Sequence, residues 1–449
     1  MSTTTPTTPP VRGTPTGATL TERVRAGNAR HLFPCETRLY AEPLVLARGD
    51  GVFVEDTDGR TYLDLFSGIL TTSVGHCHPE VVGAVQRQVE TLGHTSTLYM
   101  TENEVAMAER LTRIAPRGLD RTFFTNSGTE AIETAVMLAR VHTGRSDVFA
   151  LRYGYSGRSA LATDLTAHAA WRPLPASAPG IKHVLSPYPY RCPFHRPCDE
   201  RCVDALAHDL EEAIVTTTNG RPAALLAETV LGVGGYIVPQ PGYFARVAEV
   251  IRRYGGLLII DEVQSGFGRT GGHWFGIEHW GVEPDIMVMA KGIANGFPVA
   301  ATMARDDVAK SWTAKTISTF GGNPVGMAAA IATNDVMVRE NVPARAEARG
   351  RQLREGLDAL QARHDWIGDV RGMGLMQALE LVDDRESRTA SATHAKRLLE
   401  AAKDEALLIG VGGLNGNVIR IGPSLLITEE EVADALARLE RACQRVEAA

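Results

Sequence analysis

The chain has 449 residues, of which 44% are hydrophobic, a composition typical of a soluble globular protein. It carries 46 basic and 53 acidic residues, and its net charge of −7 argues against a nucleic-acid-binding protein. No apolar run reaches the roughly 18–20 residues that a membrane-spanning helix needs, so we expect no membrane partner.

The first 18 residues are mostly Thr, Pro, Gly and Ser, and they lack the apolar segment of a secretory signal peptide. A transit peptide is an alternative, since no acidic residue precedes Glu22, but Arg12 is the only basic residue in this stretch. We therefore predict a disordered tail over 1–18. Six cysteines in such a long chain do not indicate a secreted disulfide framework, and we expect a cytoplasmic protein.

The predicted elements begin with a β-hairpin between Asp50 and Leu65, whose turn is Asp58-Gly59. Helical patterns follow over Val81–Leu92 and Glu102–Ile114. Farther along, the predicted strands are Phe123–Phe124, Asp147–Leu151, Ala223–Ala227, Leu257–Ile260 and Ile286–Met289, and the predicted helices among them are Thr129–Arg140 and Tyr243–Tyr254. This alternation predicts an α/β fold with a mostly parallel central sheet and helices on both faces.

Beyond about residue 335 the sequence predicts a smaller α/β unit that begins with a long helix over Pro343–His364. We expect this unit to pack with the N-terminal hairpin. The predicted organisation is therefore a large ligand-binding domain over 76–335 and a small domain built from 19–75 and 336–449, because a chain of this length exceeds one simple core.

Two predicted strands end in charged residues that suggest chemistry. Asp261 follows the apolar run Leu257–Ile260, and Lys291 follows Ile286–Met289 and Ala290. In doubly wound sheets, ligands bind beyond the carboxyl ends of the strands. A lysine that forms a Schiff base and a carboxylate that keeps a pyridine nitrogen protonated suit a cofactor with an aldehyde and a heterocyclic ring. A structural ion pair at the sheet edge explains the spacing equally well.

A third segment, Ser127-Gly128-Thr129, lies between a predicted strand and a predicted helix. Small residues with free amides at a helix N-terminus can bind a phosphate. By itself the tripeptide fits a plain helix cap better, but beside a cofactor site the phosphate interpretation is favoured.

Together with Asp261–Gly271 and Lys291-Gly292, the segment Ser127–Ala131 resembles the class III aminotransferases, a family of pyridoxal 5′-phosphate enzymes. The similarity extends from about residue 35 to about residue 435. It implies a fold-type-I pyridoxal-phosphate transferase with this cofactor. It also implies a homodimer with shared active sites, or a larger assembly such as a tetramer.

The resemblance assigns roles to matching positions. Lys291 would carry the cofactor and shuttle the proton, and Asp261 would pair with the pyridine nitrogen. The other implied cofactor contacts are Val263 and Tyr155 on the two ring faces, Gln264 at the ring hydroxyl, Ser127, Gly128 and Thr129 at the phosphate, and Thr319 at the phosphate of the partner subunit. The family more often has His at the position of Ser156.

Substrate contacts follow from the same resemblance. Arg420 matches the family arginine that binds a carboxylate, for which its planar fork is suited. Glu228 matches a glutamate that can pair with this arginine, although the family usually has Pro where Thr229 stands. Tyr99 is expected at the mouth of the site. A structural salt bridge for Arg420 and Glu228, and a core position for Tyr99, are the alternatives.

The segment that contains Cys192, His195, Cys198 and Cys202 resembles the alanine–glyoxylate aminotransferase 2 subgroup and its phospholyase relatives. Three thiols and one imidazole could bind zinc. Their spacing is not that of paired Cys-x-x-Cys motifs, and prolines stiffen the segment, so a structural loop without metal is expected.

The predicted function is an aminotransferase that moves an amino group from an amino acid or ω-amine to pyruvate, glyoxylate or 2-oxoglutarate. It would work by a ping-pong mechanism through the Lys291 aldimine. The alternatives are a lyase of the phospholyase type or a racemase on the same cofactor. A non-catalytic binding protein is disfavoured by the intact Lys291 and Asp261.

Overall fold

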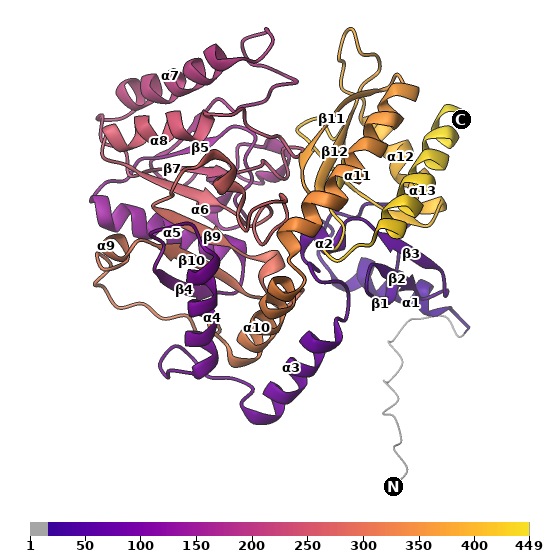
Figure 1. The fold of residues 1–449 in the computed structure, drawn as a ribbon, viewed down its shortest axis with the longest axis horizontal. Helices are drawn as coiled ribbons and strands as arrows, with labels where there is room; N and C mark the ends of the chain where they lie inside the picture. Colours follow the sequence, from indigo (N-terminus) through magenta and orange to yellow (C-terminus); the bar gives the residue numbers. More distant parts are fainter. Residues whose placement is uncertain (1–16, 449) are drawn as a thin grey trace.

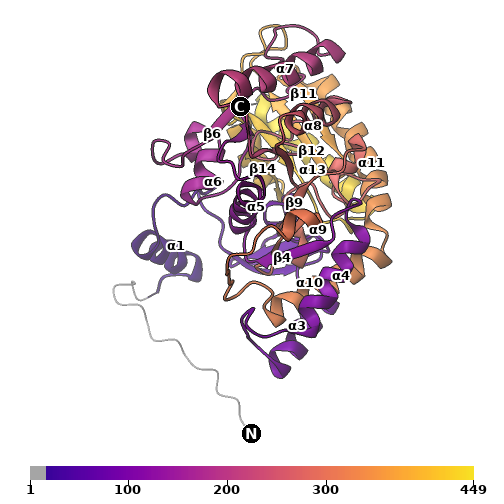
Figure 2. The same cartoon turned by 90° about the vertical axis from the view of Figure 1, so that its left-hand side faces the viewer.

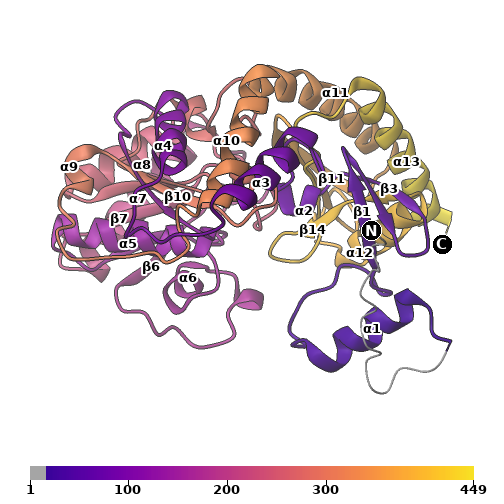
Figure 3. The same ribbon diagram turned by 90° about the horizontal axis from the view of Figure 1, so that it is seen from below.

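The computed structural model describes residues 17–448, so most of the predicted tail lies outside the described residues. The ribbon has a larger part on the left of Figure 1 and a smaller part on the right, which contains both the first strands and the C-terminal helix. The first helix, α1 (Leu20–His31), projects from the body in two perpendicular views (Figures 2 and 3). It begins with a capping box in which Thr19 and Glu22 satisfy each other's backbone amides.

The larger part is built on a seven-stranded sheet. Its strands, in spatial order, are β4 (Arg121–Thr125), β10 (Ala300–Ala304), β9 (Ile286–Met289), β8 (Leu257–Asp261), β7 (Ala224–Glu228), β5 (Val148–Leu151) and β6 (Ile181–Val184). All neighbouring pairs are parallel except those of β10, which is antiparallel to both β4 and β9. The predicted mostly parallel sheet is confirmed.

Helices cover both faces of this sheet because its strands are apolar on both sides. Along β8, Ile259 packs in one cluster with α5 (Gly128–Thr143), whereas Leu258 and Ile260 pack in another with α7 (Glu200–Thr217) and α8 (Tyr243–Arg253). Complete burial of one such side chain contributes roughly 1.5–3 kcal/mol. The two cores thereby hold the carboxyl ends of the strands in a fixed register.

The smaller part combines two four-stranded sheets. One contains β11 (Ile367–Met373), β12 (Met376–Leu381), β15 (Val418–Ile421) and β14 (Gly410–Gly412), and the other contains β1 (Leu46–Asp50), β2 (Phe53–Asp56), β3 (Thr61–Asp64) and β13 (Leu407–Leu408). β13 pairs with β3 in parallel, which joins the C-terminal segment to the N-terminal hairpin. The exact domain bounds stay a prediction.

The remaining helices connect and cover these sheets. They are α2 (Ser67–Leu70), α3 (Pro79–Thr91), α4 (Glu102–Ile114), α6 (Ala160–Leu165), α9 (Asp306–Ala309), α10 (Pro324–Arg339), α11 (Val342–Arg363), α12 (Ala392–Asp404) and α13 (Glu429–Ala448), with short 3₁₀ turns at Ala169–Trp171, Gly276–Trp280 and Lys291–Ala294. α10 packs against α3 and α4, while α11 packs against β11 and α13. Among the described residues, none of these helices has both the length and the apolar character needed to cross a bilayer.

Candidate active site

Three charged side chains lie at the carboxyl edge of the large sheet. Glu228 ends β7, Asp261 ends β8, and Lys291 follows the end of β9. Glu228 and Asp261 are register partners on neighbouring strands. All three residues line one cavity of about 580 Å³, its open mouth included. The fold therefore places them where ligands of doubly wound sheets bind.

Asp261 is buried and Lys291 is half-buried, and each affects the ionisation of the other. Burial raises the pKa of Asp261 to about 6, whereas a hydrogen bond from the Val263 amide (2.9 Å) and the charge of Lys291 act to lower it. Burial lowers the pKa of the Lys291 amine to about 8, against the charges of Asp261 and Glu228. An amine with such a pKa is neutral often enough near neutral pH to act as a nucleophile or base.

Glu228 is held by backbone amides. Its Oε1 accepts a hydrogen bond from the Tyr155 amide (2.8 Å), and its Oε2 accepts one from the Gly232 amide (2.7 Å). Burial, followed by the charge of Asp261, raises the pKa of Glu228 to about 8. A salt bridge between Glu228 and Arg420, which the sequence suggested, is not formed among the residues that the structure describes.

The N-terminus of α5 lies at one end of the cavity. Gly128 and Thr129 begin this 16-residue helix, whose free amides and positive end favour an anion. Thr129 Oγ1 accepts a hydrogen bond from the Arg158 amide (3.3 Å). Gly157 lies so close that a Cβ there would be 2.3 Å from Thr129 Oγ1. These four residues form a cradle that fits a phosphate group.

Val263, Tyr155 and Gln264 line the rest of the cavity. A Cβ on Gly128 would lie 3.3 Å from Val263 Cγ1, so the valine closes over the helix start. Gln264 Oε1 is buried without a hydrogen-bond partner among the described residues. Buried polar atoms are normally paired, and a ligand with a hydroxyl group in this cavity would satisfy this one.

Arg420, on β15, lies in an adjoining cavity together with Trp171 and the β14 residue Gly412. Its guanidinium lies over the rings of Phe66 and Tyr236, at 5.1 and 5.8 Å from their centroids. Its Nε and Nη2 donate to a backbone carbonyl (3.2 and 2.9 Å), whereas its buried Nη1 has no partner among the described residues. One donor of the planar fork is thus available to an anion.

Besides Arg420, three predicted site residues lie outside the first cavity. Ser127 caps α5 by accepting a hydrogen bond from the Glu130 amide (3.2 Å), as the plain-cap interpretation expects. Thr319 is exposed. Tyr99 is 69% exposed, so the alternative of a core aromatic does not hold. The cavity in turn includes Ile132, which sequence reasoning missed because it looks like any apolar residue of a helix.

Thr229, which stands where the family usually has Pro, has a structural explanation. Its hydroxyl donates to Glu262 Oε1 (2.7 Å) and also lies 3.1 Å from Ser265 Oγ. Glu262 is fully buried and accepts further hydrogen bonds from the amides of Gly276 and Ile277. This network fixes the turn that follows β8 and therefore the position of Asp261 at its start.

Comparisons with known proteins bear directly on this site. The family profile described as "Aminotransferase class-III" matches residues 37–443. The chain belongs to the class III aminotransferases. It is 39% identical over 401 residues to the mitochondrial alanine–glyoxylate aminotransferase 2 homolog 2 of Arabidopsis thaliana, covering 89% of this chain and 83% of that one. It is 35% identical to the human mitochondrial alanine–glyoxylate aminotransferase 2, covering 91% and 84%.

Solved structures of transaminases agree. A thermostable (S)-enantioselective omega-transaminase from Thermomicrobium roseum superposes with a TM-score of 0.88 at 33% identity, over 96% of this chain and 99% of that one. An amine transaminase from an uncultivated Pseudomonas species, solved with pyridoxal phosphate bound, gives a TM-score of 0.86 at 33% identity, over 92% and 98%. The fold-type-I architecture and the cofactor are thereby established.

This class III aminotransferase uses pyridoxal 5′-phosphate to transfer an amino group from an amino donor to a 2-oxo acid. The cavity fits this cofactor, because it offers an anion cradle at α5, a carboxylate and an amine at the strand ends, and the unpaired Gln264 oxygen. No comparison supports the lyase or the racemase. The expectation of a cytoplasmic location is wrong by the same comparisons, since the Arabidopsis and human relatives are mitochondrial proteins.

Proposed function

We propose that Lys291 binds the cofactor and moves the transferred proton, while Asp261 holds the cofactor ring nitrogen in its protonated form. The observation that carries this assignment is that the Lys291 amine and the buried Asp261 carboxylate line one cavity at adjacent strand ends. Gly128 and Thr129 would bind the phosphate from α5. Val263 and Tyr155 would enclose the ring, with Gln264 at its hydroxyl.

The cofactor, once bound, withdraws electrons from the substrate carbon that loses its proton. The Lys291 amine, with its pKa lowered to about 8, would take that proton from the substrate Cα and deliver it to the C4′ atom of the cofactor. Burial around Asp261 excludes water from the carboxylate, so that its charge acts at close range on the ring nitrogen. The backbone hydrogen bonds of Glu228 keep this second carboxylate in place beside Asp261.

Arg420 is the proposed binding site for the substrate carboxylate. Its Nη1 is buried and unpaired among the described residues, and its charge is close enough to contribute to the lowered pKa of Lys291. The guanidinium also lies over the rings of Phe66 and Tyr236, whose π-systems attract its charge and restrict its movement. We infer a small 2-oxo acid as acceptor, namely pyruvate, glyoxylate or 2-oxoglutarate, and an amino acid or an ω-amine as donor. The names of the relatives cover both donor classes.

The test compares Arg420→Ala with the wild type on two donors. With an amino acid donor and glyoxylate, KM for both should rise about 100-fold, because a bidentate carboxylate contact is lost. The half-reaction with an amine that lacks a carboxylate should change less than about threefold. Arg349→Ala, which removes a half-buried guanidinium paired with the exposed Glu429, is the matched control. Equal losses with both donors would assign Arg420 a structural role.

We also propose a homodimer. Several apolar side chains of two neighbouring segments are exposed, which is unusual for a monomer; they are Leu98 (73%), Tyr99 (69%), Met100 (97%), Ile317 (54%) and Phe320 (60%). The segments are in contact, because Thr97 Oγ1 donates to the Ser318 carbonyl (3.4 Å) and the His94 ring lies tilted against the Phe320 ring, with the centroids 4.9 Å apart. Thr319 lies within this patch, where a partner subunit could be reached.

A further inference from the structure

Three thiols converge outside the active site. Cys192 follows the segment 186–191, Cys198 lies in the next turn, and Cys202 lies in the first turn of α7. Their sulfur atoms all lie within 4.8 Å of one another, and the Sγ atoms of Cys192 and Cys202 are 3.7 Å apart. Cys192 and Cys202 are buried, and Cys198 is half-buried. The sequence analysis named these cysteines as possible zinc ligands but expected a metal-free loop, because their spacing is not that of paired Cys-x-x-Cys motifs.

The distance between the Cys192 and Cys202 sulfur atoms matches a specific coordination geometry. Zinc–thiolate bonds are about 2.3 Å long, so two thiolates of a tetrahedral zinc site lie about 3.8 Å apart. We propose that Cys192, Cys198 and Cys202 form a three-thiolate binding site for a zinc ion, with solvent at the fourth position. Each thiol releases its proton to solvent when the metal binds, and no redox step is involved.

The charges around the cluster support metal binding. Three thiolates and one Zn²⁺ carry a net negative charge, and the Arg196 Nε donates to Cys202 Sγ (3.4 Å). Cys202 also lies at the N-terminal end of an 18-residue helix, whose dipole stabilises a thiolate. The turn is closed by a hydrogen bond from the His195 amide to the Cys192 carbonyl (3.0 Å). The ligands therefore come from one compact loop that requires little rearrangement.

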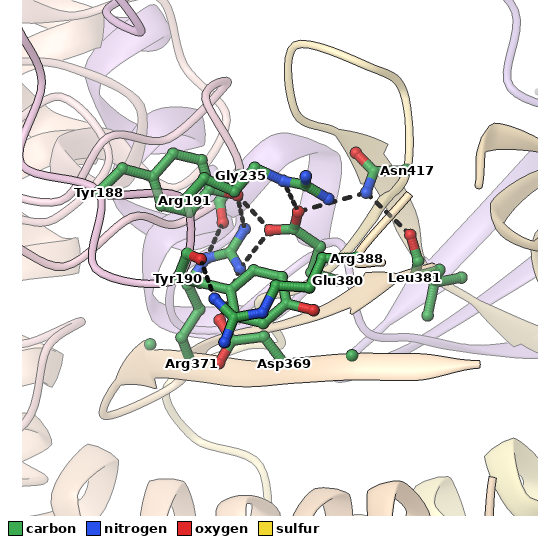
Figure 4. Close-up of polar contacts among 12 residues, drawn as sticks. Tyr188, Tyr190, Arg191, Gly235, Asp369, Arg371, Glu380, Leu381, Arg388 and Asn417 are labelled. Atoms are coloured by element: carbon green, nitrogen blue, oxygen red, sulfur yellow. Dashed lines mark hydrogen bonds and ion pairs between the residues drawn. The ribbon is translucent and has the colours of Figure 1, made fainter. Parts of the chain in front are cut away.

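The loop lies next to a polar network that joins the two parts of the molecule (Figure 4). Arg191, beside Cys192, donates to Glu380 Oε1 on β12 (2.5 Å), and Tyr188 donates to the same carboxylate. Arg371 on β11 bonds Glu380 (2.7 Å) and the Tyr188 hydroxyl (3.0 Å). A metal at the three thiols would anchor the end of this segment to α7. Its removal should loosen the contact between segment 186–191 and the small sheet.

The experiment measures metal and thiols on the purified holoenzyme, prepared under a phosphine reductant that spares the cofactor aldehyde. After zinc is added and the unbound metal is removed, one zinc ion per chain should remain bound. The bound zinc should protect three thiols from reaction with a thiol reagent. Co²⁺ in its place should give sulfur-to-cobalt charge-transfer absorbance. Cys198→Ser and Cys202→Ser should lower zinc affinity at least tenfold, whereas Cys35→Ser, at an exposed cysteine outside the cluster, should not.

Chelation of zinc should lower the melting temperature of the wild type and leave that of Cys198→Ser unchanged, which would show that the stabilisation comes from metal bound at the three thiols. The proposal is overturned if the reduced wild type retains no zinc against a micromolar competitor. It is also overturned if Cys198→Ser and Cys202→Ser retain zinc with wild-type affinity. A Cys192–Cys202 disulfide in a protein that binds no zinc after reduction would assign the cluster to redox chemistry instead.

Discussion

At the scale of single residues, Lys291 places an amine in the field of two carboxylates, Asp261 and Glu228. Lys291→Ala should lower turnover by at least about 10³-fold, since the proposed assignment makes this residue both the cofactor attachment and the proton carrier. Borohydride treatment of the wild type, followed by digestion and mass spectrometry, should find the cofactor on the peptide that contains residue 291. Lys310→Ala, at an exposed surface lysine, is the control. Retention of turnover by Lys291→Ala contradicts the assignment.

Glu228 gives a prediction on pH. Burial raises its pKa to about 8, above the ordinary value of 4.5, so the folded chain keeps a proton that the unfolded chain releases. The contribution of protonated Glu228 to the free energy of unfolding is complete below about pH 4.5 and is lost as the pH rises toward 8. Glu228→Gln keeps the neutral form at every pH.

In the cofactor-stripped protein, the melting temperature of Glu228→Gln should therefore exceed that of the wild type increasingly from pH 6 to about pH 8. Differential scanning fluorimetry across this range measures the difference. Glu386→Gln, an exposed position, should follow the wild type. A constant offset between Glu228→Gln and the wild type would show that Glu228 does not titrate in this range.

The sequence indicated which residue types form this site better than it indicated which hydrogen bonds they make. Asp261 and Lys291 could be placed because apolar runs ending in charge mark the carboxyl edge of a sheet. The hydrogen-bond partners of Glu228 could not be predicted, because they are the backbone amides of Tyr155 and Gly232, and a sequence pattern describes side chains only. The three thiols were recognised as possible zinc ligands, but their spacing could not predict how closely they converge, because the convergence depends on an irregular turn.

At the scale of elements, the strand ends stay open to a ligand because some glycines permit close approach. A Cβ on Gly232 would lie 2.2 Å from Gln264 Nε2, although the backbone φ there is not positive. Gly232→Ala should push Gln264 from its position and weaken cofactor binding about tenfold without unfolding the chain. Equilibrium titration with the cofactor measures this loss. Gly27→Ala, with nothing within 4 Å, is the control, and an equal change in both would contradict the steric argument.

Strand prediction failed where composition does not favour a strand. β10 contains three alanines in five residues, yet it is fully buried between β4 and β9. Pairing on both sides, and not propensity, makes it a strand. β6 was missed at the opposite edge of the sheet, where its residues are mostly half-buried. By contrast, the helix over Glu102–Ile114 was predicted to the residue, because its amphipathic pattern and its Thr101 cap agree.

At the scale of the whole molecule, two polar side chains connect the cofactor-binding part to the rest. Asn295 accepts a hydrogen bond from the Val74 amide (3.0 Å) and donates to the Gly75 carbonyl (2.8 Å). Arg269 is fully buried and donates to the carbonyls of Leu375 and Pro423. These contacts hold Lys291 and Arg420 in register, although the two residues come from different sheets.

The proposed dimer gives the most demanding prediction. If Thr319 serves the site of the partner subunit, each active site takes Lys291 from one chain and Thr319 from the other. Lys291→Ala then damages the site of its own chain, whereas Thr319→Ala damages the site of the partner. Mixing the two variants under conditions of subunit exchange should then produce mixed dimers in which one site has both defects and the other has neither. Such a mixture should recover turnover well above the sum of the two variants, up to about one quarter of the wild-type value when half of the dimers are mixed. Native mass spectrometry confirms the exchange, and a mixture that exchanges without any recovery would show that each site is complete within one chain.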